Sequence, residues 1–458
     1  MMIDSSPMPP SLARLRRLLA LGALAIPALI PTLAQAQSAQ DALADAADSG
    51  DTAWMLAASL LALLLVLPGL ALFHAGRVRA ASMVSVFAQT GAAVALVSLL
   101  WVVVGYTLAF GSVTSGWLGS GNAWMLIDLG NVRDGTLVPE SAYALFEMVF
   151  ALLPPALMVG AWVERARFGW VVGFCGLWSL IVYAPVAHWV WGGGWLATRL
   201  GTVDYAGGLV VHVTSGVSAL VVALLMGRRE RFAATGAAPV PSPAPGSPVL
   251  TVAGAGLAWA GSLALAGGSA LSAGDDAAMA LINTHICAAA AALVWLLLER
   301  LNGHHRPSAT GFAQGAVAGL AMIAPVAGYV GVGSAILLGL IAAPLVRGGA
   351  AVVRQSLHID DSLDVFARHG LAGAAGTVLA ALALSPRLGG TGYAQGMDLA
   401  HQVVGQVVAL GAVAAWSAIA TAIAALMVSM ALPMRVTREA EMAGLDEGSH
   451  GESVFKAG

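Results

Sequence analysis

Two histidines lie inside long apolar segments at corresponding places in the two halves of the chain. His212 and His369 are each followed, four residues later, by a glycine: Gly216 and Gly373. An ionisable side chain at membrane depth is costly and by default marks a functional site. Two such rings in equivalent positions predict one pore at the interface of two structural repeats.

Paired imidazoles can carry a proton. A neutral ring offers one hydrogen-bond donor and one acceptor, so two rings that stack or meet edge to edge could share a proton and pass it on. The glycines would let a second helix or ring approach closely. Burial disfavours the charged imidazole, so we expect at most one additional proton on the pair. The alternative is that each ring is only hydrogen-bonded to nearby backbone.

A second group of residues is aromatic. Phe146 and Phe150 are four residues apart and share one helix face, while Trp191 and Ser269 each lie near the end of another apolar segment. Aromatic rings attract a small cation, and a hydroxyl accepts a hydrogen bond from it. These residues therefore predict a cation-binding site, with an interfacial aromatic belt as the alternative.

Acidic residues precede both histidine segments. Asp204 comes a few residues before the segment of His212, where it would either cap a helix or hold an outer site by its charge. Asp360, Asp361 and Asp364 precede the segment of His369. For these three we expect the usual role of acids at a helix N-terminus, which is to interact with the helix dipole.

The composition identifies the elements that must position these residues. Hydrophobic residues make up 59% of the 458 and charged residues 10%, with a mean hydropathy of +0.83, whereas soluble domains carry about 25% charged residues. We therefore predict an all-α polytopic membrane protein. Cys175 and Cys287 lie in apolar runs and do not suggest a disulfide framework. No nucleotide-binding or hydrolase motif is present, so we expect no enzyme activity, cofactor, metal or nucleic-acid partner.

Residues 1–36 have the pattern of a signal peptide. A basic segment precedes a proline-interrupted apolar run, and Ala34-Gln-Ala36 is typical of a cleavage site; a retained first helix is the alternative. The remaining chain predicts eleven spans of roughly 20 residues. They cover 53–73, 83–110, 144–163, 169–192, 206–226, 249–272, 277–299, 309–329, 331–346, 367–386 and 401–432.

Charge and composition orient these spans. Fifteen basic residues fall on one set of alternating loops, their margins and the tail, and three fall on the other set. The positive-inside rule then places the mature N-terminus outside a bacterial inner membrane and the C-terminus in the cytoplasm.

The proline-rich stretch 235–248 has the composition of a linker. Because five spans precede it and five follow from the opposite side, we predict inverted repeats with an eleventh helix outside them.

Several long motifs resemble those of the ammonium transporters of the Amt/Mep/Rh group, and most closely the bacterial Amt branch. They are AWVERARF (161–168), YAPVAHWVWGGGWL (183–196), DYAGG (204–208), the segment of His212 and DDSLDVFARHG (360–370). This resemblance covers nearly all of residues 37–432, the predicted membrane domain, and extends into the tail 433–458.

The resemblance implies specific roles. Trp191, Phe146 and Ser269 would recruit ammonium or methylammonium, supported by Asp204. Phe150 would form a gate, and His212 with His369 would line the pore. Family members resemble homotrimers in lipid with one pore per subunit, and the tail resembles a regulatory segment that couples to a PII-class protein.

Two positions depart from the family pattern. Leu265 occupies the place of the second gate phenylalanine, and Phe73-His-Ala-Gly76 replaces Phe-Tyr-Gly-Gly.

A bare cation is costly to move through an apolar tube, so we predict that ammonium loses its proton, that ammonia crosses, and that the proton follows by way of the histidines. A passive ammonia channel, an ammonium sensor and, remotely, a membrane enzyme are the alternatives.

Overall fold

A computed structural model describes residues 46–113, 116–121, 123–127, 129–234, 246–301 and 306–454. The predicted signal peptide (1–36), residues 235–245 of the predicted linker, and the last four residues of the tail lie outside this description.

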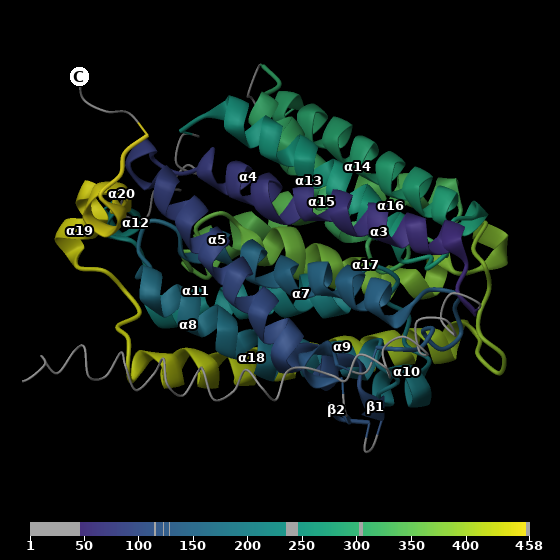
Figure 1. Ribbon diagram of the computed structural model, residues 1–458. Coiled ribbons are helices and arrows are strands. Elements are labelled where there is room, and N and C mark those ends of the chain that lie inside the picture. The colour runs from purple at the N-terminus through teal and green to yellow at the C-terminus, as the bar shows by residue number, and fades with distance from the viewer. Residues whose placement is uncertain are drawn as a thin grey trace, which may run out of the picture.

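The described chain is almost entirely helical (Figure 1). Its first half contains α3 (Ser49–Leu64), α4 (Ala71–Ala75), α5 (Met83–Leu100), α6 (Tyr106–Phe110), α7 (Glu140–Trp162), α8 (Phe168–Trp178), α9 (Ala184–Val190), α10 (Trp195–Leu200), α11 (Thr214–Met226) and α12 (Glu230–Ala234). Its second half contains α13 (Pro248–Gly268), α14 (Asp275–Leu301), α15 (Ala309–Ile323), α16 (Val332–Ala351), α17 (Ala372–Ala383), α18 (Leu399–Ser429), α19 (Arg438–Ala443) and α20 (Leu445–His450). A short antiparallel pair, β1 (Ser112–Val113) and β2 (Gly119–Ser120), joins two of the helices.

Nine helical segments within the described residues are long and apolar enough to cross a membrane. They confirm a multi-pass membrane protein and correspond to nine of the eleven predicted spans. The prediction at 309–329 corresponds to the shorter helix α15. The prediction at 367–386 corresponds to a π-helical stretch, Phe366–Leu371, followed by α17.

The helices of the two halves pack side by side around a common centre. The first helix of one half, α3, contacts the first helix of the other, α13, while α11 contacts both α7 and α18. Figure 1 shows α19 and α20 at one end of the bundle, and α10 with β1 and β2 at the other. We call these the tail end and the hairpin end.

Side-chain oxygens begin several of the long helices. Asp48, Ser247, Ser308 and Asp398 each accept a hydrogen bond from a backbone N–H in the first turn of α3, α13, α15 and α18, respectively. Such caps satisfy amides that have no partner within the helix. They give the membrane helices defined starting points.

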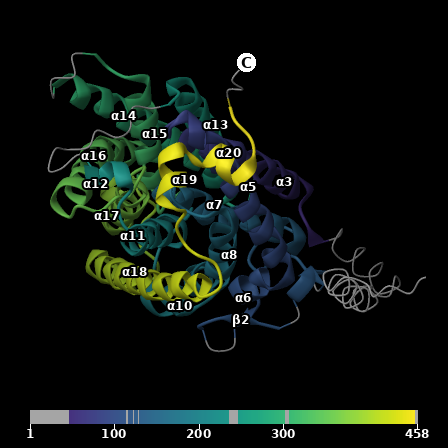
Figure 2. The same ribbon diagram turned by 90° about the vertical axis from the view of Figure 1, so that its left-hand side faces the viewer.

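The tail folds back on the tail end of the bundle (Figure 2). Asp446 accepts hydrogen bonds from the backbone N–H groups of Val84 and Ser85, at 3.1 and 2.8 Å, in the first turn of α5. Glu441 accepts from the N–H of Glu230 at 2.7 Å, where α12 begins. Both carboxylates are buried, so the tail is an integral part of this end of the bundle.

A buried cluster of charges connects loops at the tail end. Arg229 contacts Asp360 through two hydrogen bonds of 2.9 Å and Glu164 through one of 2.8 Å. Glu164 also accepts from Arg79 at 2.8 Å. Burial alone would raise the pKa of both acids, but the arginines hold the pKa of Glu164 and of Asp360 below their ordinary values. Their ionised forms are thus favoured by folding.

This cluster predicts acid-sensitive stability. Because the folded pKa values of Glu164 and Asp360 are depressed, their stabilising contribution is complete above the unfolded values of 4.5 and 3.8 and is lost as pH falls through the folded values. We expect the Tm of the detergent-solubilised protein to fall steeply below about pH 4.5.

The double variant Glu164→Gln/Asp360→Asn should have a lower Tm at pH 7 and a flatter dependence on acid. Removing one side of a buried ion pair costs about 3–5 kcal/mol. Asp134→Asn, at an exposed position, is the control and should follow the parent protein. Parallel acid curves for the parent and the double variant would contradict the assignment.

Candidate functional site

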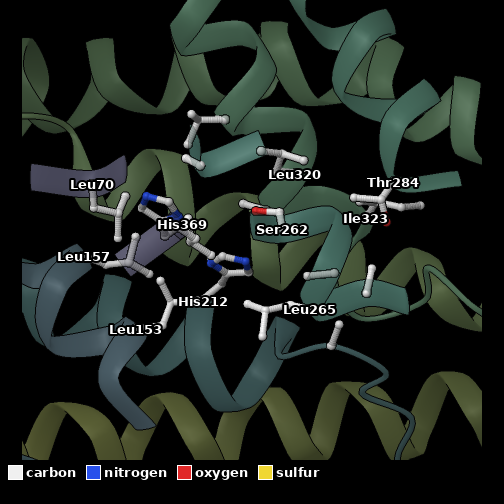
Figure 3. Close-up of a pocket in the computed structure, with 17 residues that line it drawn as sticks. Leu70, Leu153, Leu157, His212, Ser262, Leu265, Thr284, Leu320, Ile323 and His369 are labelled. Atoms are coloured by element: carbon white, nitrogen blue, oxygen red, sulfur yellow. Dashed lines mark hydrogen bonds between the residues drawn. The ribbon is translucent and has the colours of Figure 1, made fainter. Parts of the chain in front are cut away.

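The rings of His212 and His369 lie next to each other and nearly parallel, and they meet through their Nδ1 atoms (Figure 3). Their Nδ1 atoms are 3.2 Å apart, the ring centroids are 5.2 Å apart, and the ring planes differ by 14°. Each histidine belongs to a short π-helical stretch, Gly208–Val213 in the first half and Phe366–Leu371 in the second. One Nδ1 must carry the hydrogen and the other must accept it, so the pair shares one proton position.

Glycines permit this close approach, as the sequence predicted. A Cβ atom on Gly216 would lie 2.2 Å from the backbone N and Cα of Gly370, and one on Gly373 would lie 2.7 Å from the Cβ of His212. Two helices therefore touch backbone to backbone beside the ring pair.

A cavity of about 40 Å³ adjoins both histidines. Its walls are mainly leucine, isoleucine and alanine, and Figure 3 shows Leu153, Leu157 and Leu265 around the ring pair. A single water needs roughly 10–15 Å³ of comparable volume. The cavity is therefore large enough for very few molecules of that size, and its apolar walls offer a cation little solvation.

The predicted aromatic residues gather beyond this cavity. The ring centroids of Phe146 and Phe150 are 5.4 Å apart, and those of Phe150 and Trp191 are 5.0 Å apart. Both phenylalanines are fully buried, and Trp191 is half-buried. The ring of Phe146 lies against Gly268, where a Cβ atom would be 2.4 Å away. The structure thus brings the three rings together.

Ser269 connects this aromatic group to the cavity. It follows Gly268 directly, and its hydroxyl donates a hydrogen bond of 2.9 Å to the carbonyl of Leu265. Leu265 itself lines the cavity. Because the two residues are one helical turn apart, the aromatic group and the cavity lie next to each other along α13.

Asp204 caps the segment that carries His212. One carboxylate oxygen accepts from the N–H groups of Gly207 and Gly208 at 3.2 and 2.5 Å, and the other from Leu209 and Val210 at 2.9 and 3.0 Å. These four bonds occupy about all the lone-pair sites of a carboxylate. Asp204 therefore fixes backbone in this structure and leaves no oxygen free for a ligand.

The same residue also links to the aromatic group. The indole N–H of Trp191 donates a 2.7 Å hydrogen bond to the Asp204 carbonyl. Burial raises the pKa of Asp204 to about 6, while its four backbone bonds oppose that rise. The carboxylate is thus mainly ionised at neutral pH and places a negative charge near the rings.

Sequence reasoning missed two polar residues of the cavity, Ser262 and Thr284. Ser262 shares a helix face with Leu265 and Ser269, at positions i, i+3 and i+7, and this spacing was the available signal. In the sequence, His74 was noted only as a departure from the family motif. In the structure its side chain is buried, and neither ring nitrogen has a hydrogen-bond partner. Within the described ranges, no three His, Cys, Asp or Glu side chains are grouped to hold a metal ion.

Comparison with known proteins agrees with this arrangement. Residues 53–455 match the sequence profile described as the Ammonium Transporter Family. The chain belongs to the ammonium transporter family. It is 38% identical over 410 residues to "Ammonium transporter" of Aquifex aeolicus, covering 89% of this chain and 94% of the relative. It is 37% identical to "Ammonium transporter" of Bacillus subtilis, covering 89% and 98%.

Solved structures of the family have the same fold. The crystal structure of Saccharomyces cerevisiae Mep2 superposes with a TM-score of 0.79 at 30% identity, covering 87% of this chain and 89% of Mep2. A structure described as "Sensor Amt Protein" gives a TM-score of 0.81 at 25% identity, covering 88% of this chain and 98% of that one. Family membership confirms the resemblance found in the motifs, whereas the roles of individual site residues remain predictions.

Proposed function

We propose that this protein takes up ammonium by removing its proton, conducting ammonia through the cavity beside His212 and His369, and passing the proton along the two rings. The observation that carries this proposal is the Nδ1–Nδ1 contact of 3.2 Å beside an apolar cavity. A titratable pair in such surroundings suits a proton but not a hydrated ion.

Desolvation explains the expected selectivity. An isolated ion loses a large solvation energy when it enters an apolar environment. Neutral ammonia loses far less, and ammonium becomes ammonia by giving up a proton. Potassium has no equivalent step, so the leucine walls would exclude it.

Recruitment would take place at the aromatic group. The faces of Trp191 and Phe146 would attract the cation, and the Ser269 oxygen would accept one of its hydrogen bonds. Asp204 would act through its charge and through its hold on the segment of His212. Because Phe146 and Phe150 are closely packed, Phe150 would have to move to admit ammonia toward Leu265.

The proton would follow through the ring pair. His212 would take a proton on one nitrogen while its neighbour accepts at the shared Nδ1 position. Ammonia and the proton would then arrive on the same side, and uptake would move one positive charge. This proposal predicts an electrogenic transporter.

The finer features of the architecture belong to the same proposal. Segments 309–323 and 366–383 would complete eleven spans in two inverted repeats of five, with α18 outside them. The tail end would face the cytoplasm of a bacterial cell, and the hairpin end would face outward after removal of residues 1–36. We further propose a homotrimer in the inner membrane, with the tail as a regulatory segment for a PII-class partner.

The test is the double variant His212→Ala/His369→Ala in liposomes. We expect its ammonium-evoked current to fall about tenfold or more, because a positioned proton carrier typically contributes about 10²–10⁴-fold. Potassium should evoke no current in the parent protein. An unchanged current in the double variant would refute the relay, whereas ammonia flux without current in the parent would identify a passive channel.

A sensor is the second candidate function. The structural similarity to "Sensor Amt Protein" extends over 98% of that chain, so the fold is compatible with sensing. Ammonium-dependent signalling that persists in a transport-inactive variant would favour this alternative.

A further inference from the structure

A third buried histidine lies beside the ring pair. His74, in α4, is 1% exposed, and neither of its ring nitrogens has a hydrogen-bond partner. Buried polar groups are normally hydrogen-bonded. By contrast His188, the other fully buried histidine of the first half, uses its Nδ1 in a 3.0 Å contact with a backbone carbonyl. Both ring nitrogens of His74 are therefore free of protein partners and can take part in proton transfer.

Helix geometry places His74 about one turn beyond the cavity. Leu70 and Leu157 line the cavity, and Figure 3 shows them together on one side of the histidine pair. His74 follows Leu70 by four residues and Gly160 follows Leu157 by three. Each step is about one helical turn toward the tail end, or roughly 5.4 Å.

Contacts show that the His74 ring faces Gly160 of α7 and the start of the His369 segment. A Cβ atom on Gly160 would lie 3.0 Å from His74 Nε2 and 2.9 Å from the Cγ2 of Val365. Val365 precedes His369 by four residues and so lies about one turn from it. Three elements thus place the His74 ring next to His369, on the side away from the aromatic group.

His369 has a nitrogen available in that direction. Its Nδ1 faces His212, whereas its Nε2 is buried without a partner. A ring that receives a proton on one nitrogen can release it from the other. Direct contact or one bridging water would carry the proton between the two rings.

The charges around His74 favour release of a proton over its retention. Arg77 lies three residues after His74, and Arg368 directly precedes His369. Their guanidinium groups lie over the Phe73 ring, 5.4 and 5.3 Å from its centroid. Asp364 forms an ion pair with Arg77 at 3.6 Å. On α7, the residue that faces the His74 ring is Gly160, which carries no charge. The surrounding groups are therefore mainly cationic, and an imidazolium at His74 would readily lose its proton.

We propose that His74 is a third proton carrier, which takes the proton from His369 and releases it at the tail end. This inference rests on the proposed transport function. The N–H bond at His369 Nε2 breaks while one forms at a His74 nitrogen, directly or through one water. The other His74 nitrogen then gives its proton to water at the tail end. Both rings finish neutral.

The experiment measures charge moved per methylammonium in proteoliposomes, from the membrane current and the uptake of labelled methylammonium in the same preparation. The variants are His74→Leu, which fills the space, and His74→Gln, which keeps a polar side chain that does not titrate. His188→Leu is the control, as a buried histidine outside the cavity lining. A purely structural role for His74 would lower current and uptake together and leave their ratio unchanged.

We expect both His74 variants to lower the charge per methylammonium about tenfold, a modest share of what a positioned proton carrier contributes. The His188 variant should keep the parent ratio. A parent-like ratio in either folded His74 variant would overturn the proposal. If the parent itself moves no charge per methylammonium, or if the His212/His369 variant keeps full coupling, the proposed function fails instead.

Discussion

Replacing Asp204 with leucine is expected to reduce ammonium transport to background. The carboxylate accepts four backbone hydrogen bonds at the start of the segment that carries His212. Hydrogen bonds to a charged group contribute about 1.5–3 kcal/mol each. Their loss would leave four amides at the start of the His212 segment unsatisfied, whereas the hydrogen bond from Trp191 to the backbone carbonyl of Asp204 would remain. Methylammonium uptake in vesicles is the measurement.

The isosteric variant Asp204→Asn separates charge from shape. Its amide oxygen can accept only some of the four backbone hydrogen bonds, and its NH₂ group would face backbone N–H donors. We therefore expect transport to remain strongly impaired. Asp398→Asn is the matched control, because Asp398 also caps a helix but is exposed. Near-normal transport by folded Asp204→Asn protein would show that neither the negative charge nor the complete cap is needed.

Replacing Gly216 with valine is expected to eliminate folded protein. Even a single Cβ atom there would lie 2.2 Å from the backbone of Gly370, and backbone cannot yield as a flexible side chain can. Overpacking a close-packed interior typically costs about 1–3 kcal/mol, and a clash between two backbones should exceed that range. Yield and Tm in detergent measure the effect.

A graded pair of variants makes this prediction sharper. Gly216→Ala should lower the Tm less than valine does, and it should weaken transport by separating His212 from His369. Gly91→Ala in α5 is the control, because a Cβ atom there meets nothing within 4 Å. A Gly216→Ala protein with the Tm and transport of the parent would contradict the close backbone contact.

The sequence was sufficient to predict nine of the helical segments and the central pair. Apolar length indicated the spans, and two histidines in matching segments, each followed by glycine, indicated a shared centre. The structure confirms that His212 and His369 meet. It also shows that the Asp204 carboxylate caps the segment, which is one of its two predicted roles; its role at the outer site stays a prediction.

Other features depend on contacts between distant parts of the chain. Nothing local in the sequence indicates that Arg229 binds both Asp360 and Glu164, which are far apart along the chain. The π-helical turns at both histidines have no signal in the local sequence either. His74 appeared only as an unusual residue in a motif; its unpartnered nitrogens require coordinates to be seen.

The docked tail has a practical consequence for regulation studies. Asp446 and Glu441 supply the hydrogen-bond acceptors for the first amides of α5 and α12. Cutting the chain after residue 432 would therefore remove these acceptors, and we expect it to destabilise the first turns of both helices. Substitutions at exposed tail positions such as Met442 leave these hydrogen bonds in place and are the better test of the proposed regulatory role.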